Sequence, residues 1–252
     1  MQTGCYLYGL VQTSEELDLG PIGLDYDGEP ANVHTLRVGD IGAIVSPHAR
    51  CRRVLPRRKN LAPHNQVLGE VMKTTTIVPM TFGHVAESEE AIRTVLERHQ
   101  AAIRAELTRV EGCVEMSVVM RWDVENIFAH LVTHDPVLRA MRDDLFAPGQ
   151  EPNHEQRLAL GQRFEQRHEH ERNRLRTMLL ESLEPAVRQV EHATCRTMER
   201  VAQLALLVQR EQVPALSDQV DQAAQSFGPS YAFEVAGPWP PFSFVELSLS
   251  EQ

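Results

Sequence analysis

Two histidines in one charged segment, His168 and His170, are the most direct candidates for metal chemistry in this chain. The segment predicts a helix, and residues two apart on a helix point in different directions. Two such side chains cannot easily hold one metal ion. We therefore expect no metal site here, and we interpret His168 as a partly buried structural histidine beside the apolar stripe of its helix.

Other polar residues lie near the ends of predicted elements. Asp123 and Glu125 follow a predicted strand, where two acids can form an acid–base pair but also serve as helix caps. No nucleophile or anion hole accompanies them, so we assign no catalytic residue. His64 follows Pro63 at a predicted helix start. It can make a polar contact in a cleft between domains, or act as a helix cap or buried hydrogen-bond partner, and we favour the second interpretation.

Sequence motifs for enzymes are also missing. The chain has no GxxxxGK[ST] loop, no GxGxxG after a strand, no HExxH and no GxSxG. Its cysteines are far apart and form no CxxC pair, which favours free thiols over a metal site: Cys5, Cys51, Cys113 and Cys195. These observations predict a protein that is not an enzyme and holds no cofactor.

Charge and composition limit the partners. The formal net charge of −10 disfavours nucleic-acid binding, which needs a basic surface. One basic segment, residues 50–59, can be a phosphate-binding or acidic-partner patch, or a solvated loop between a strand and a helix, and we favour the loop. No apolar run approaches 18 residues, so we expect no membrane span. The N-terminus lacks a basic region of a signal peptide, so we expect the chain to stay in the cytosol.

The elements that position these residues fall into two groups, since 252 residues suffice for one large or two modest domains. Residues 1–112 predict an N-terminal α+β domain. Its strands are predicted at residues 5–11, 33–38, 41–45 and 74–78, with a hairpin turn at Gly39-Asp40. Its helices are predicted from Pro63 to about Lys73, and from the N-cap Ser88 to Gly112.

Residues 113–236 predict a second domain. It begins with a strand whose apolar residues alternate: Val114, Met116, Val118, Met120 and Trp122. Helices follow near residues 127–145, with a restart at Asp135-Pro136, and a long helix is predicted over 153–190. The remaining elements are strands at 193–200 and 201–210, a helix at 213–227 and a strand at 231–235. This order is typical of a ferredoxin-like fold with a long helical crossover.

A Pro/Trp-rich tail, residues 237–252, completes the chain. Its prolines cannot lie inside a helix or a central strand, yet strand-like residues flank them. We therefore predict a rigid aromatic linker and a strand-like segment at 242–249. Such a tail can add to a sheet edge or dock on a partner. Its candidate residues for partner binding or docking are Trp239, Pro240, Pro241, Phe242 and Phe244.

Four blocks in order carry a resemblance to a known family. They are the Cys-Tyr-Leu-Tyr-Gly-Leu-Val run at 5–11, the segment 58–83 with its Ile-Val-Pro-Met-Thr-Phe-Gly end, the Val-Val-Met-Arg-Trp-Asp run at 118–123, and the Gly-Pro-Trp-Pro-Pro-Phe-Ser-Phe run at 237–244. Together they span nearly the whole chain. In these blocks the sequence resembles the gas vesicle protein L/F family (GvpL/GvpF).

The resemblance implies a non-enzymatic accessory protein of gas vesicle formation. It implies association with the gas vesicle, its small apolar shell protein and other accessory proteins, either as an assembly factor or as a minor vesicle component. Self-association through sheet edges is a further expectation. The candidate structural or inter-domain residues are Tyr8, Gly9, His64, Pro79, Phe82, Gly83, Arg121 and Trp122.

Two other interpretations stay open. A regulatory ligand-binding module of ferredoxin-like architecture predicts a thermal shift with a small molecule. An enzyme with an unrecognised site predicts a deep pocket with perturbed carboxylates or histidines.

Overall fold

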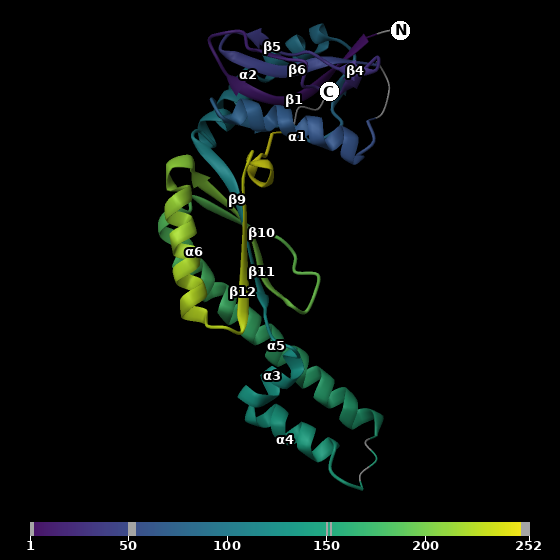
Figure 1. The fold of residues 1–252 in the computed structure, drawn as a ribbon, viewed down its shortest axis with the longest axis vertical. Coiled ribbons are helices and arrows are strands. Elements are labelled where there is room, and N and C mark those ends of the chain that lie inside the picture. Colours follow the sequence, from purple (N-terminus) through teal and green to yellow (C-terminus); the bar gives the residue numbers. More distant parts are fainter. Residues whose placement is uncertain (1–2, 50–53, 150, 152, 248–252) are drawn as a thin grey trace. The chain divides into compact units, whose positions relative to one another are not determined.

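The computed structural model describes residues 3–49, 54–149, 151 and 153–247, and shows a mixed α/β protein (Figure 1). It divides into two compact units. The first unit holds the described residues of Met1–Met116, Leu207–Arg210 and Gly237–Gln252, and the second holds those of Ser117–Leu206 and Glu211–Ala236.

Six strands in the described part of the first unit form one sheet, in the order β2-β5-β6-β1-β7 with β8 beside β1. Their bounds are β1 Thr3–Gln12, β2 Asp18–Gly20, β5 Val33–Val38, β6 Ile41–Ala49, β7 Ile77–Pro79 and β8 Val85–Ala86. A small separate pair consists of β3 Asp25–Tyr26 and β4 Glu29–Pro30. The predicted hairpin is confirmed, because β5 and β6 pair antiparallel around Gly39, whose φ is 64°.

Two helices cover opposite faces of this sheet. They are α1 (Arg58–Met72) and α2 (Glu89–Arg109). Tyr6 of β1 hydrogen-bonds His64 of α1, whereas its neighbour Leu7 lines a hollow with Leu96 of α2. Adjacent residues of a strand point to opposite faces, so each helix packs on its own side. This explains why the described side chains of β1 from residue 4 to residue 11 are buried.

The end signals of α2 are confirmed. The Ser88 hydroxyl accepts a hydrogen bond from the Ala91 amide at 3.2 Å, and Gly112 adopts a φ of 69° just beyond the helix. The predicted start of α1 at Pro63 is wrong, since the helix begins at Arg58. The five residues before Pro63 include good helix formers, and the Leu61 amide already bonds the Arg57 carbonyl.

The predicted strand at 74–78 is also misplaced. The Thr74 and Thr75 amides both donate to the Val71 carbonyl, so the chain is still turning after α1. The strand β7 occupies Ile77–Pro79 instead. β-branched residues favour extended backbone, but here the carbonyls at the end of the helix capture the amides of the first two.

The second sheet has four strands among the described residues, in the order β10-β11-β9-β12. Their bounds are β9 Cys113–Trp122, β10 Gln189–His192, β11 Arg200–Gln209 and β12 Tyr231–Trp239. The alternation predicted for β9 is confirmed, because Val114, Met116, Val118, Met120 and Trp122 are all buried. β12 lies at an edge of the sheet. An edge strand tolerates Pro238, because proline has no N–H to donate and an edge strand pairs on one side only.

Four helices accompany this sheet: α3 Ile127–His134, α4 Pro136–Leu145, α5 His154–Leu183 and α6 Val213–Phe227. Asp135 caps α4 as predicted, since its carboxylate accepts from the Val137 and Leu138 amides at 2.9 and 3.0 Å. Asn153 and Gln156 form a capping box at the start of α5.

The predicted helix over 153–190 and strand over 193–200 are corrected. Helix α5 ends at Leu183, because Pro185 cannot continue an α-helix, and a 3₁₀ turn (Glu184–Ala186) follows. The edge strand is β10 at Gln189–His192. Residues 193–199 form a loop, although the Ala193 amide still reaches the Gln203 carbonyl.

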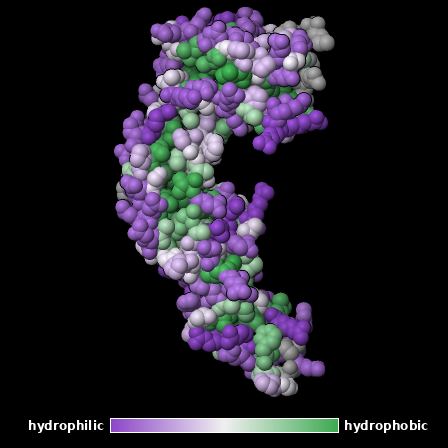
Figure 2. Space-filling model, in the orientation of Figure 1, coloured by the Kyte–Doolittle hydropathy of each residue, from purple (hydrophilic) through white to green (hydrophobic). Residues whose placement is uncertain are grey.

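Some apolar side chains reach the surface of the second unit. Val137 and Phe146 at the two ends of α4, and Leu158 on α5, are more than half exposed. Figure 2 shows green side chains among the purple ones over these helices, at the bottom of the view. No helix among the described residues is both long enough and apolar enough to span a membrane.

Candidate functional site

The C-terminal tail packs within the first unit, beside Glu115 and Met116 of β9. Gly237 lets the chain approach closely, because its φ is 127° and an added Cβ would lie 2.8 Å from the Met116 Sδ and 2.9 Å from the Glu115 carbonyl oxygen. The peptide bond between Gly237 and Pro238 is cis. Side chains other than hydrogen would therefore not fit at this point of the tail.

A set of polar contacts holds the tail. The Ser243 amide and hydroxyl donate to the two carboxylate oxygens of Glu115 at 2.7 and 2.8 Å. The Glu246 amide donates to Glu106 at 2.9 Å, and the Arg109 guanidinium donates to the Phe244 carbonyl. Arg109 and Glu106 are themselves paired at 2.6 Å. Two residues of α2 and one of β9 thus fix the backbone of the tail.

One aromatic side chain anchors the tail and two others remain at the surface. Phe244 is 1% exposed, whereas Trp239 is 51% and Phe242 is 40% exposed. Pro240 and Pro241 are buried. The predicted strand at 242–249 is wrong within the described residues, since Phe242–Phe244 form a 3₁₀ turn that directs Phe244 into the core. Residues 248–249 of that prediction lie outside the described residues.

The ion pair under the tail is partly buried. Burial opposes ionisation of Glu106, but hydrogen bonds from Arg109 and from the Glu246 amide outweigh it and lower the pKa of the carboxyl. Glu106 is 9% exposed. Its carboxylate oxygens are paired with Arg109 and accept from the Glu246 amide. The sequence showed no sign that Glu106 and Arg109 contact the tail, because their partners Glu246 and Phe244 are 140 and 135 positions away.

A second group of candidate residues forms an aromatic cluster in the first unit. The Tyr6 hydroxyl accepts from the Gly83 amide at 2.9 Å and lies 3.0 Å from the His64 Nδ1. The hydrogen of this second contact belongs to the Tyr6 hydroxyl or to the His64 Nδ1, according to the tautomer of the imidazole. The Tyr8 ring stacks on His64 with centroids 5.7 Å apart, and Phe82 meets His64 edge-on at 5.4 Å.

These hydrogen bonds pair the Tyr6 hydroxyl and the His64 Nδ1 inside a buried cluster. Tyr6, Tyr8 and His64 are at most 1% exposed, and burial lowers the pKa of His64 to about 4. His64 is therefore a neutral, buried hydrogen-bond partner within one unit. Phe82 is half-buried. This placement matches the interpretation of His64 favoured from the sequence.

Gly9 and Pro79 lie beside this cluster. They are opposite one another in the pairing of β1 with β7. A Cβ on Gly9 would lie 2.8 Å from the Ile77 Cδ1 and 2.9 Å from the Val78 carbonyl oxygen. Gly9 therefore permits close strand packing.

Arg121 and Trp122 belong to the second unit, whereas the cluster belongs to the first. Arg121 pairs with Asp123 at 3.7 Å and with Glu234 at 3.3 Å, so Asp123 is part of a surface ion pair. Trp122 is buried, with its ring 5.3 Å from His130 and 4.9 Å from Tyr231. The candidate residues thus form three separate sets.

His168 is 6% exposed, and its Nε2 lies 3.0 Å from the Met198 carbonyl oxygen. This contact agrees with a structural histidine. Among the described residues, no group of three or more His, Cys, Asp or Glu side chains could hold a metal ion.

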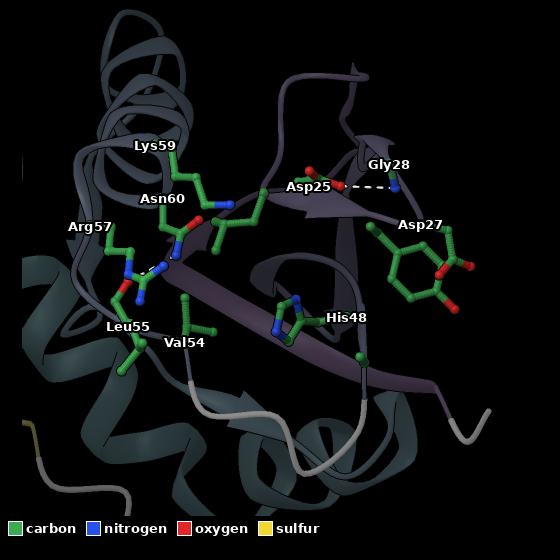
Figure 3. Close-up of a pocket in the computed structure, with 12 residues that line it drawn as sticks. Asp25, Asp27, Gly28, His48, Val54, Leu55, Arg57, Lys59 and Asn60 are labelled. Carbon is green, nitrogen blue, oxygen red and sulfur yellow. Dashed lines mark hydrogen bonds between the residues drawn. The ribbon is translucent and has the colours of Figure 1, made fainter.

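The basic segment borders a hollow of about 440 Å³ in the first unit (Figure 3). Arg57, Lys59 and Asn60 at the start of α1 line one side, and Asp25 and Asp27 line another. The lining carries two positive and two negative side chains, so its charges do not favour a phosphate ion. Residues 50–53 of the predicted patch lie outside the described residues.

The family profile described as gas vesicle synthesis protein GvpL/GvpF matches residues 4–246. Gas vesicle protein F of Streptomyces sp. (strain CB03234) is 27% identical over 244 residues, covering 96% of this chain and 99% of that protein. Gas vesicle protein L2 of Halobacterium salinarum is 27% identical over 269 residues, covering 97% and 92%.

A solved structure shows the same fold. The crystal structure of the gas vesicle protein GvpF from Anabaena sp. PCC7120 superposes with a TM-score of 0.86 at 23% sequence identity, covering 98% of this chain and 99% of that one. The profile match extends from β1 to the docked tail. The chain belongs to the gas vesicle synthesis protein GvpL/GvpF family.

Proposed function

We propose that this protein supports gas vesicle assembly by binding the small apolar shell protein through the exposed aromatic residues of its docked tail. The observation that carries the proposal is the different exposure of the aromatic side chains in the tail. Phe244 is buried and anchors the segment, while Trp239 and Phe242 are 51% and 40% exposed. Aromatic residues dominate interface energetics, and large exposed ones are typical of binding surfaces.

The way in which the tail is held supports this role. Hydrogen bonds to Glu115, Glu106 and Arg109 fix the backbone at Ser243, Phe244 and Glu246, directly after Phe242. A segment that is already ordered loses less conformational entropy when a partner binds. A shell subunit with a large apolar face aggregates unless that face is covered, so a fixed aromatic surface is a suitable contact.

Several finer statements belong to the same proposal. The protein would act in the cytosol and at the gas vesicle, with other accessory proteins as further partners, and by binding and not by catalysis. Edge strands β10 and β12 give a route for self-association.

We also propose two domains, residues 1–112 and 113–236, followed by the tail. The second would be ferredoxin-like. The strand order β10-β11-β9-β12, with α3–α5 after β9 and α6 after β11, supports this assignment.

Co-purification with the shell protein tests the proposal. The full chain should retain the shell protein, and a chain truncated after Ala236 should lose it. If the truncated chain still retained the shell protein, the contact would lie in the domains and not in the tail. A well-folded full chain that captures no shell protein would refute direct binding.

A further inference from the structure

A hollow of about 460 Å³ lies in the second unit, whereas the tail belongs to the first. It is bordered by the end of β9, by α3 and α5, and by the start of β12. Its lining includes Trp122, His130, His134, Arg167, Glu171 and Tyr231. None of these residues takes part in the proposed contact with the shell protein.

Trp122 gives the hollow a buried donor. The residue is 3% exposed, and within the described part of the chain its indole Nε1 has no hydrogen-bond partner. Indole N–H can only donate, and buried polar groups normally find partners. A ligand that enters this hollow and satisfies Trp122 must therefore offer an acceptor atom.

The charges of the lining favour an anion. Glu171 is the single carboxylate among the lining side chains in the described structure, and it is already engaged by Arg167 Nη1 at 2.8 Å and by Arg174 Nε at 3.2 Å. A guanidinium has five N–H donors, so donors remain on both arginines. The side chain of Arg174 is 50% exposed and itself lines the hollow.

Beside the polar side chains of His134, His170 and Ser230, the lining has an apolar and aromatic part. Trp122 and Tyr231 lie 4.9 Å apart between ring centroids, Trp122 and His130 lie 5.3 Å apart, and Leu131 is buried beside them. This surface suits a hydrocarbon group next to the charged end of a ligand. An inorganic anion would leave it uncovered.

We propose that this hollow binds a small organic carboxylate. The carboxylate accepts from the Trp122 indole N–H and from Arg174, and its apolar body packs on the rings and on Leu131. The inference does not rest on the proposed shell-protein contact, since it concerns other side chains in the other unit.

Hexanoate is the probe, and inorganic phosphate is the comparison. The chain contains two tryptophans, so the Trp239→Phe variant makes Trp122 the single indole reporter. Titration of this variant with hexanoate should change its fluorescence in a saturable way, and calorimetry should give the same dissociation constant. No saturable change in the folded protein would overturn the proposal. Phosphate binding as tight as hexanoate binding would overturn the assignment to organic carboxylates.

Two variants locate the ligand. Trp122→Phe keeps a ring but removes the donor, and Arg174→Gln removes a cation, so each should weaken hexanoate binding about tenfold or more in calorimetry. Arg172→Gln is the matched control, because Arg172 pairs with Glu169 on the same helix and does not line the hollow. Circular dichroism checks that each variant is folded. Unchanged affinity in the first two variants would overturn the proposal.

Discussion

Buried His64 should make the first unit sensitive to mild acid. Burial lowers its pKa from an ordinary 6.5 to about 4, so the unfolded chain binds more protons than the folded one between these values. The free energy of unfolding should therefore fall as the pH drops from about 6.5 toward 4. At about 1.4 kcal/mol per pKa unit, the full loss is about 3 kcal/mol, of which about 2 kcal/mol is reached at pH 5.

The assay compares unfolding at pH 7.5 and pH 5. Urea titration read by hydrogen exchange of β1 peptides follows the unit that contains His64. His64→Gln retains an acceptor for the Tyr6 hydroxyl but does not titrate, so its loss between the two pH values should be about 2 kcal/mol smaller than that of the wild type. The matched control is His154→Gln, because His154 is exposed on α5. Equal losses in His64→Gln and the wild type would refute the reasoning.

Three further predictions concern stability. Gly9→Ala should destabilise the first unit by about 1–3 kcal/mol in urea unfolding, because its Cβ would meet Ile77 and Val78. Gly69→Ala in α1 has open space and should stabilise the unit by about 0.5–1 kcal/mol. Equal effects of the two substitutions would contradict the packing argument. Phe244→Ala should cost about 3 kcal/mol and speed amide exchange at Ser243 and Glu246, and unchanged exchange would show that Phe244 is not the anchor. Asp135→Ala should lower the melting temperature more than Asp135→Asn, because asparagine can still cap α4. Both variants lose the ion pairs with Arg163 and Arg167. The opposite order of melting temperatures would refute the capping role.

Local signals predicted much of the fold. The hairpin at Gly39-Asp40, the alternation of β9, and the caps Ser88 and Asp135 depend on neighbouring residues, so the sequence contains what is needed to identify them. The last strand was predicted to end at Val235, but β12 continues through Pro238 to Trp239, since an edge strand tolerates a proline.

The errors have a different cause, because tertiary contacts decided the structure there. Residues 193–199 have strand-like composition, but the short edge strand β10 already lies before them. Phe242–Phe244 also reads as extended, but burial of Phe244 favours a turn. Contacts of the tail with Glu106 and Glu115 join residues more than 120 positions apart, so no local pattern reveals them.

The most direct test of the proposed function is the affinity for the shell protein of a chain carrying Trp239→Ser and Phe242→Ser. Both side chains are exposed while Phe244 remains in place, so the fold and the docking of the tail should survive. Phe146→Ser is the control, since Phe146 is 70% exposed but lies in the other unit. We predict that the double variant loses at least about tenfold in affinity and that Phe146→Ser binds like the wild type. Wild-type affinity in the folded double variant would contradict the account.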